Sequence, residues 1–258
     1  MPVRTATALV PQFLLFLALS ALMACAAARA GDAPDIGAFR PGDRILFQGD
    51  SITDGGRQRE GDDLNHIMGQ DYAYLVAARI GAELPGRNLL FLNRGISGNR
   101  IVDLKDRWQR DTLDMRPDIL SILVGVNDTN SVIDQKPPIV TAADYAAIYS
   151  ELIQRTLAAL PHVRLVLCEP FALPGGGRTR EHWRERQADL QSRQRIVSDL
   201  GARHHIPVVH FQAVFDQACL RAPAATWIWD GIHPTYAGHQ LMADEWLRVV
   251  SEFYSRSP

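Results

Sequence analysis

Residues 44–51 read Arg-Ile-Leu-Phe-Gln-Gly-Asp-Ser, so an apolar run gives way to a glycine and then to two polar residues. A short apolar segment that stops at a glycine is typical of a buried strand. Ser51 then lies at the carboxyl end of the first strand, where open α/β sheets place their ligands. We therefore take the Ser51 hydroxyl as the first candidate for a reactive group.

The same pattern returns along the chain. Short apolar runs predict strands at residues 44–48, 89–93, 119–124, 163–168 and 207–211. Helical patterning follows each of them, at residues 72–80, 101–110, 144–160, 183–203 and 236–253. Near-continuous apolar strands that alternate with helices predict an α/β fold with a parallel sheet covered on both faces. No stretch rich in Pro, Gly or Ser divides the chain, so we expect one domain.

Three further motifs follow predicted strands. They are residues 93–99 (NRGISGN) after the second strand, 125–128 (GVND) after the third and 230–233 (DGIH) after the fifth. Because parallel strands end at the same edge of a sheet, we expect these loops to meet Ser51 in one cleft.

Serine, imidazole and carboxylate side chains are sufficient for a hydrolytic triad, whatever their order in the chain. A serine hydroxyl needs a base within hydrogen-bond reach, which His233 supplies, and Asp230 accepts the other imidazole N–H. Taken alone, each residue has a structural role by default. Their shared place at the strand ends favours the catalytic interpretation of Ser51, His233 and Asp230.

Attack on an ester builds negative charge on the carbonyl oxygen, and hydrogen-bond donors must already face it. The candidate donors are the backbone N–H groups of Ser51 and Gly95 and the side-chain amide of Asn127. The alternatives are a plain turn glycine at Gly95 and a turn-forming asparagine at Asn127.

The first thirty residues differ from the rest of the 258-residue chain. Arg4, an apolar stretch at residues 13–19 and the string Ala-Arg-Ala at 28–30 predict a secretory signal peptide over residues 1–30, with the mature domain at 31–258. We expect a periplasmic or secreted protein without stable membrane insertion. The alternatives are an N-terminal anchor and lipid attachment at Cys25.

Composition narrows the possible partners and cofactors. A formal net charge of −2 gives no basis for nucleic-acid binding. The cysteines outside the predicted signal, Cys168 and Cys219, are too few for a closed zinc site, and we expect two buried, unpaired thiols. We predict no metal and no cofactor.

Three surface and packing predictions remain. The arginines at 184, 186, 193 and 195 are expected on a solvated helix face, and Gly175–Gly177 in a mobile surface loop. In the last helix, a core-facing stripe is predicted from spacing at Met242, Trp246, Val249 and Phe253.

Taken in order, the strings at 49–51, 95, 125–128 and 230–233 match the four sequence blocks of the SGNH (GDSL) hydrolase superfamily, which this chain resembles. The wider strings at 49–57, 93–99, 103–108 and 229–239 look like those of bacterial acetyl xylan esterases. The resemblance covers residues 43–250. It implies a flavodoxin-like three-layer α/β/α sandwich with a five-stranded parallel sheet, and ester hydrolysis without a metal.

The resemblance also implies residue roles. Ser51 would be the nucleophile and an oxyanion donor, Gly95 and Asn127 the other donors, and Asp230 and His233 the rest of the triad. Trp229 matches a tryptophan beside the catalytic aspartate of close relatives, and its role here is either packing or shaping of the acyl pocket. From the residues themselves, Trp229 and Asp50 are weaker candidates for substrate binding, and the alternative for Asp50 is to orient the loop after the first strand.

We therefore expect a serine esterase that removes O-acetyl groups from xylan-type poly- or oligosaccharides through an acetyl-enzyme, and that can form homo-oligomers. Two alternatives stay open. One is a lipase-like or lysophospholipase-like hydrolase of the same superfamily, and the other is a non-catalytic polysaccharide-binding protein.

Overall fold

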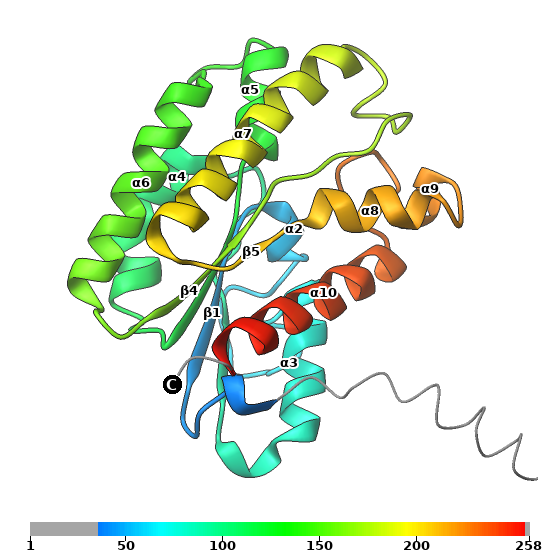
Figure 1. The fold of residues 1–258 in the computed structure, drawn as a ribbon. Helices are drawn as coiled ribbons and strands as arrows, with labels where there is room; N and C mark the ends of the chain where they lie inside the picture. Colours follow the sequence, from blue (N-terminus) through cyan, green and yellow to red (C-terminus); the bar gives the residue numbers. More distant parts are fainter. Residues whose placement is uncertain (1–35, 256–258) are drawn as a thin grey trace, which may run out of the picture.

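A computed structural model describes residues 36–255 of the chain (Figure 1). Its centre is a five-stranded sheet with the order β2-β1-β3-β4-β5, in which every pairing is parallel. The strands are β1 (Arg44–Gly49), β2 (Leu90–Asn93), β3 (Ile119–Leu123), β4 (Arg164–Cys168) and β5 (Val208–Val209). The predicted fold class is confirmed.

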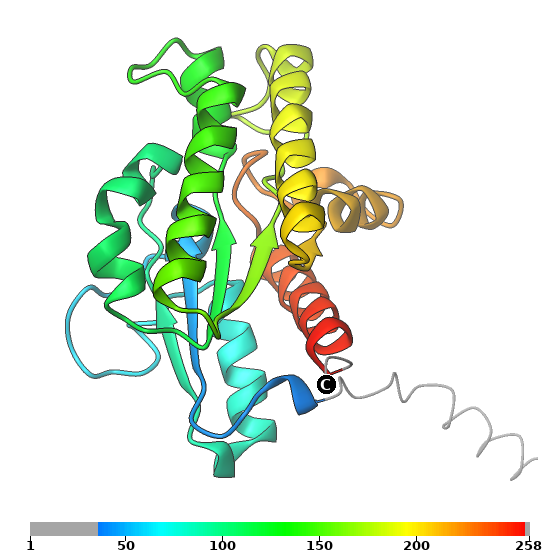
Figure 2. The ribbon, with the colours of Figure 1, turned by 60° about the vertical axis from the view of Figure 1, so that its left-hand side comes forward.

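Helices cover both faces of this sheet (Figures 1 and 2). The long helices are α3 (Tyr72–Glu83), α4 (Ile101–Trp108), α6 (Ala142–Ala159), α7 (Trp183–His204) and α10 (Tyr236–Tyr254). Shorter helices are α2 (Ser51–Asp54), α5 (Val126–Ile133), α8 (Phe211–Cys219) and α9 (Ala224–Trp227). Single turns are η1 (Ile36–Ala38), η2 (Pro85–Arg87) and the π-helical η3 (Gln109–Leu113).

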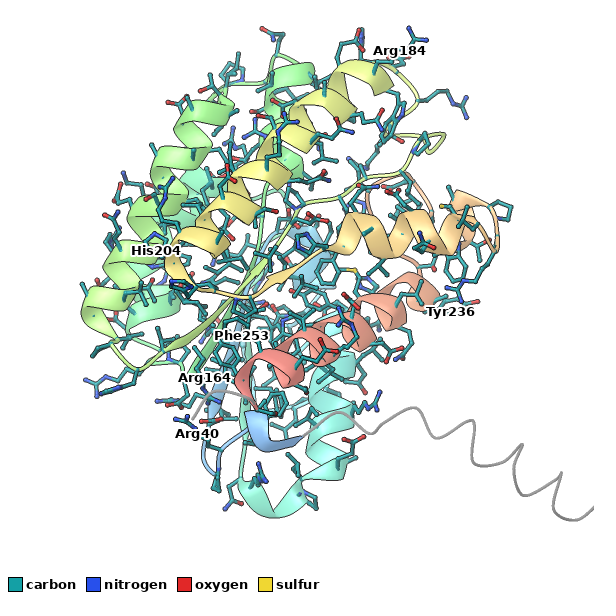
Figure 3. All side chains as sticks on the ribbon, in the orientation of Figure 1. Arg40, Arg164, Arg184, His204, Tyr236 and Phe253 are labelled. Carbon is teal, nitrogen blue, oxygen red and sulfur yellow. The ribbon has the colours of Figure 1, made fainter. Side chains whose placement is uncertain are left out.

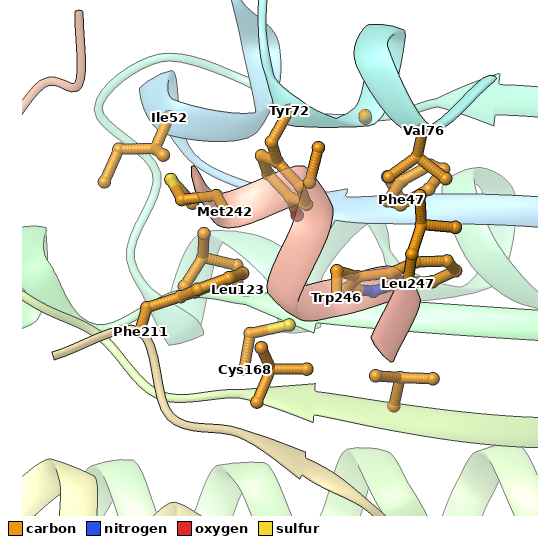
Figure 4. Packing of buried hydrophobic residues seen from close by; sticks show 14 of the residues in the cluster. Phe47, Ile52, Tyr72, Val76, Leu123, Cys168, Phe211, Met242, Trp246 and Leu247 are labelled. Atoms are coloured by element: carbon orange, nitrogen blue, oxygen red, sulfur yellow. The ribbon is translucent and has the colours of Figure 1, made fainter. Parts of the chain in front are cut away.

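Two hydrophobic clusters separate these layers. One lies between the sheet and α3, α8 and α10, and the other between the sheet and α4, α6 and α7. In the first cluster Phe47 of β1 packs between Tyr72 of α3 and Trp246 of α10, with ring centroids 5.8 and 5.2 Å away (Figure 4). The Trp246 Nε1 donates to Ser121 Oγ of β3 at 2.9 Å, so the one polar atom of this ring is satisfied in the core.

The core-facing stripe of α10 has the predicted helical spacing, but the buried face is rotated about the helix axis from the predicted one. Met242 and Trp246 are buried as predicted, and Leu247 and Val250 continue the stripe. Val249 is only partly buried and Phe253 is 39% exposed. The buried face of α10 therefore follows Met242, Trp246, Leu247 and Val250, and it leaves Phe253 outside the core.

The last predicted strand is mostly wrong. Only Val208 and Val209 pair with β4, and Phe211 begins helix α8. The Glu169 carboxylate, which follows β4, accepts the backbone N–H of Gln212 at 3.1 Å and so holds the first turn of α8. Phe211 and Phe215 are buried one turn apart. An apolar run of this length does not distinguish a strand from the start of a helix.

The prediction of a solvated arginine face on α7 is wrong for two of its four arginines. Arg193 is fully buried, and its guanidinium donates to Asp189 one turn earlier and to the carbonyl of Val140. Its charge also lies over the Tyr145 ring at 5.1 Å. Arg186 is 4% exposed and pairs with Asp134. Both are retained in the interior because each has charged or carbonyl partners.

The predicted signal peptide and Cys25 lie outside the described residues. Within residues 36–255 no helix is both long and apolar enough to cross a membrane. The prediction of unpaired thiols is confirmed, although Cys168 is buried and Cys219 only partly so.

Candidate active site

Ser51 lies where β1 turns into α2. Gly49 ends the strand, and a Cβ there would fall 2.4 Å from Thr53 Oγ1 and 2.5 Å from the Leu123 carbonyl oxygen. Only glycine therefore allows the strand end to pass this close to its neighbours. Asp50 then caps α2, because its Oδ1 accepts the N–H of Ile52 at 3.0 Å. The cap places Ser51 as the first, half-buried residue of the helix.

The three predicted triad residues form one chain of hydrogen bonds. Ser51 Oγ is 2.9 Å from His233 Nε2, and His233 Nδ1 is 2.7 Å from Asp230 Oδ2. An ionised carboxylate only accepts, so the ring proton lies on Nδ1 and Nε2 accepts from the serine hydroxyl. This geometry equips the serine for nucleophilic attack with the imidazole as its base.

Asp230 is held as a carboxylate. Burial opposes its ionisation, but hydrogen bonds from the His233 backbone and ring and from the Ile232 N–H outweigh burial, so the pKa of Asp230 lies below its ordinary value. Its Oδ1 accepts the two backbone N–H groups at 3.0 and 2.7 Å, which leaves Oδ2 for the imidazole.

The loop that carries Asp230 is braced by the glycine loop at residues 173–179. Gly175 and Gly177 in it are exposed, in agreement with the predicted surface loop at Gly175–Gly177, but the loop also contacts the catalytic loop. Leu173 N–H donates to the Gly231 carbonyl at 2.9 Å, and Arg178 N–H donates to the Asp230 carbonyl at 3.0 Å. A Cβ at Gly176 would lie 2.0 Å from the Asp230 carbonyl carbon. The glycine is thus needed for this close backbone approach.

Arg178 also reaches the triad with its side chain. Its Nε lies 2.9 Å from Asp230 Oδ2, the same oxygen that accepts from His233. The arginine side chain is 62% exposed, whereas the Asp230 side chain is 6% exposed. Sequence reasoning missed this contact, because an arginine in a glycine-rich loop carries no pattern that connects it with a carboxylate fifty residues away.

The three candidate oxyanion donors differ in their present partners. The Ser51 backbone N–H has no hydrogen-bond partner among residues 36–255. The Asn127 amide donates to the Asn99 carbonyl at 3.2 Å, which uses one of its two N–H bonds. The Gly95 N–H donates to Asn93 Oδ1 at 2.8 Å. Its hydrogen bond is therefore already used in this structure, and the expectation that Gly95 presents a free donor does not hold here.

Gly95 has a clear steric role. A Cβ on it would lie 2.4 Å from the backbone nitrogen of Asp54, so the loop after β2 packs directly on α2. Its carbonyl accepts from Arg57 Nε at 3.1 Å and Arg59 Nη1 at 2.8 Å. The Asp54 carboxylate completes this junction by accepting the Ser97 N–H at 2.8 Å.

Two buried residues that the sequence did not single out tie the site loops together. The Asn93 amide donates to the carbonyls of Thr53 and Met68, while its oxygen accepts from Gly95. Arg107 of α4 donates to the carbonyls of Arg94 and Gly49, at 2.8 and 3.1 Å. Both lie in the strings at 93–99 and 103–108 that carry the family resemblance, but their contacts depend on the fold.

Two buried carboxylates lie behind the site. Burial, together with the nearby charge of Asp128, raises the pKa of Asp50 to about 7, although the hydrogen bond from the Ile52 N–H lowers it. Burial also raises the pKa of Asp128 to about 6, although its carboxylate accepts the Ile101 N–H at 3.0 Å. Asp50 is thus a buried cap for the nucleophile's helix, in agreement with its predicted orienting role.

Trp229 packs against the imidazole of His233. Its ring is stacked on the His233 ring with centroids 5.9 Å apart and an interplanar angle of 22°, and it is 62% exposed. Its backbone N–H donates to the His233 carbonyl at 3.1 Å. Among the described side chains, no group of three or more His, Cys, Asp or Glu is placed to hold a metal ion.

Comparison with known proteins connects this geometry to a family. A model of the GDSL-like lipase/acylhydrolase family matches residues 47–241, from the middle of β1 into α10. The chain belongs to this family. The matched segment contains every candidate residue of the site.

This GDSL-family chain is also 31% identical to an acetylxylan esterase of Geobacillus stearothermophilus, over 84% of this chain and 97% of that one. The solved structure of that esterase superposes with a TM-score of 0.72, covering 85% of this chain and 100% of the other. A proposed GDSL-like lipase of Parabacteroides merdae gives a TM-score of 0.78 at 34% identity, covering 82% of this chain and 97% of its own. The chain is thus a carboxylic ester hydrolase.

The Geobacillus enzyme has been solved as catalytic mutants in which a serine, an aspartate or a histidine is replaced by alanine. In that enzyme the aspartate and the histidine are three positions apart. Asp230 and His233 have the same spacing here.

Proposed function

We propose that this GDSL-family hydrolase removes O-acetyl groups from xylan-type oligo- or polysaccharides through an acetyl-enzyme, with Ser51, His233 and Asp230 as its catalytic residues. The observation that carries the proposal is the unbroken hydrogen-bond chain from Ser51 Oγ through the His233 ring to Asp230 Oδ2. In this arrangement the imidazole is already placed to take the serine proton.

In the first half-reaction, Ser51 Oγ attacks the acetyl carbonyl carbon while His233 Nε2 takes the hydroxyl proton. The imidazolium that forms is stabilised by Asp230 and then gives its proton to the departing sugar oxygen. The carbon–oxygen bond to the sugar breaks, and the acetyl group stays on Ser51. In the second half, His233 deprotonates a water molecule that attacks this ester and releases acetate.

The negative charge of each tetrahedral intermediate needs donors. The free Ser51 N–H and the second N–H bond of the Asn127 amide supply two of them. The Gly95 N–H becomes a third donor once its bond with Asn93 Oδ1 is shared or released. Loss of one such donor costs about 2.7–4 kcal/mol of transition-state stabilisation.

The choice of an acetylated carbohydrate is supported by the relative, an acetylxylan esterase that aligns over 97% of its own length. The Trp229 ring beside His233 also supports it, because an exposed aromatic face provides an apolar surface for sugar binding. The lipase-like alternative stays in view, since the family description also covers lipases.

The test is acetate release from acetylated xylo-oligosaccharides, compared with hydrolysis of p-nitrophenyl acetate and p-nitrophenyl octanoate. We expect acetate to be released from the oligosaccharides, and p-nitrophenyl acetate to be hydrolysed faster than p-nitrophenyl octanoate. In Ser51→Ala and in His233→Ala, kcat should fall by about 10³-fold or more. Faster octanoate cleavage without release from the sugar would favour the lipase-like function instead.

A further inference from the structure

A groove of 730 Å³ is lined by segments that follow the Ser51 and His233 loops along the chain, and it takes no part in the mechanism above. It is lined by the segment after α2, by the first turns of α3 and by the first turns of α10. Its lining includes Asn65, Gln70, Tyr74, Tyr236, His239 and Gln240. This volume falls in the usual range of small-molecule sites, about 300–1,000 Å³, and far exceeds the needs of an acetyl group.

The groove shares both loops that carry the reacting side chains. Gly56, on its rim, follows directly on α2, which begins at Ser51. Tyr236, on the opposite rim, is the first residue of α10 and comes three positions after His233. The groove is therefore joined through the chain to both loops that carry reacting side chains.

The lining is neutral and suited to hydroxyl groups. None of the described lining residues is Lys, Arg or Glu. Asp71 is buried, and its oxygens accept from the Tyr74 N–H and the Asn93 amide. His66 pairs with Asp63 at 2.7 Å. The groove therefore presents no unpaired charge for an ionic ligand.

Its remaining surface combines aromatic rings and amides with the apolar side chains of Leu75 and Ala237. Tyr236 is 90% exposed and stands at the free end of α10 (Figure 3), while Tyr74 lines the groove from α3. Burial and the nearby His233 lower the pKa of His239 to about 4, so its ring is neutral at ordinary pH. Its buried Nδ1 has no hydrogen-bond partner in residues 36–255. Aromatic faces with neutral donors and acceptors match the alternating apolar faces and hydroxyl edges of pyranose rings.

We propose that this groove binds the unacetylated sugar residues that adjoin the reacting one, so that the enzyme acts on oligosaccharide chains in preference to single acetylated sugars. This proposal rests on the proposed function for its choice of ligand. Tyr236 is the specificity-determining residue, because it joins the groove to the loop that carries His233.

The first test compares p-nitrophenyl acetate, acetylated xylobiose and acetylated xylotetraose as substrates of the wild type and Tyr236→Ala. The loss of one aromatic contact should raise KM for acetylated xylotetraose about three- to tenfold, with a smaller effect on xylobiose and little on kcat. Hydrolysis of p-nitrophenyl acetate should not change, since that ester has no sugar chain. Tyr236→Phe should behave like the wild type, because it keeps the ring.

Leu220→Ala is the matched control, an exposed apolar side chain (79%) that is not part of the groove lining. Leu220→Ala should leave KM and kcat unchanged for all three substrates. If the KM for acetylated xylotetraose is the same in Tyr236→Ala as in the wild type, the proposal is overturned. So would a change in oligomeric state of Tyr236→Ala by size-exclusion chromatography, which would make the groove a contact between copies of the chain.

A second measurement separates this proposal from the proposed function. Calorimetric titration of Ser51→Ala with unacetylated xylotetraose should give binding that Tyr236→Ala weakens in the double variant. If the wild type releases no acetate from any acetylated sugar, the proposed function fails, and xylotetraose binding alone then decides the groove. No detectable binding to Ser51→Ala would overturn the groove as a xylo-oligosaccharide site.

Discussion

Asp230 Oδ2 faces two partners, the His233 ring at 2.7 Å and the Arg178 guanidinium at 2.9 Å. The arginine is a second positive partner of this carboxylate oxygen and helps to hold it where the His233 ring meets it. Because Arg178 is mostly exposed, water and salt screen much of this effect.

We therefore predict that Arg178→Gln lowers kcat/KM by up to about fivefold, since an exposed ion pair contributes about 0–1 kcal/mol. The matched control is Arg180→Gln, since Arg180 lies in the same loop and forms no salt bridge within the described residues. The rate of p-nitrophenyl acetate hydrolysis at one fixed pH should fall for Arg178→Gln alone. An equal fall in both variants would show that net charge, and not contact with Asp230, sets the rate.

Asp50 provides a second prediction at the residue scale, for stability. Burial raises its pKa from 3.8 to about 7 in the folded protein. A carboxyl whose folded pKa is raised contributes its full stability below its unfolded pKa and loses it as the pH rises through the folded value. The wild type therefore loses this contribution between about pH 4 and pH 7, on the order of 4 kcal/mol at most.

Asp50→Asn keeps a side-chain oxygen to cap Ile52 but cannot ionise. Urea unfolding should show the variant gaining stability relative to the wild type as the pH rises from 4 to 7, then a constant difference. A difference that is flat across this interval, or that falls with pH, would rule out a buried acid at Asp50.

At the scale of elements, the glycine loop and the catalytic loop act as one unit. A Cβ at Gly176 would meet the backbone of Asp230 and Gly231 at 2.0–2.2 Å, whereas a Cβ at Gly177 has nothing within 4 Å. Gly176→Ala must therefore displace the loop that carries Asp230. A shift of about 1 Å at a reacting group costs up to about 10²-fold in rate.

The expected result is a fall in kcat of about 10- to 100-fold for Gly176→Ala, and near wild-type kinetics for Gly177→Ala. The loop is at the surface, so the melting temperature of both variants should stay within a few degrees of the wild type. Wild-type kcat in Gly176→Ala would mean that the two loops are not coupled in solution.

For the whole molecule, the sequence was most informative where one physical cause dominates. The five strands are nearly continuous apolar runs because both faces of the sheet are covered. That they exist and run parallel to one another therefore followed from the pattern. Because parallel strands end at one edge of the sheet, the sequence also predicts that Ser51, Asp230 and His233 lie close together. The structure places them in hydrogen-bond contact.

The parts that sequence reasoning missed depend on contacts between distant segments. Helix α8 replaces most of a predicted strand because Glu169 caps it from the end of β4. Arg193 is buried because Asp189, Thr129 and Val140 surround it, although its sequence neighbourhood is strongly polar. The Gly95 N–H meets Asn93 Oδ1 two residues away, and the Asn93 side chain is held there by the carbonyls of Thr53 and Met68 on other segments.

The account as a whole depends on Ser51 being the activated nucleophile. A fluorophosphonate probe forms a covalent bond only with a serine that has a base in place, so labelling followed by peptide mass spectrometry locates it directly. We predict one adduct per chain, on Ser51, that is lost in Ser51→Ala and strongly slowed in His233→Ala. An adduct on another residue, or full labelling of Ser51→Ala, would contradict the catalytic site described above.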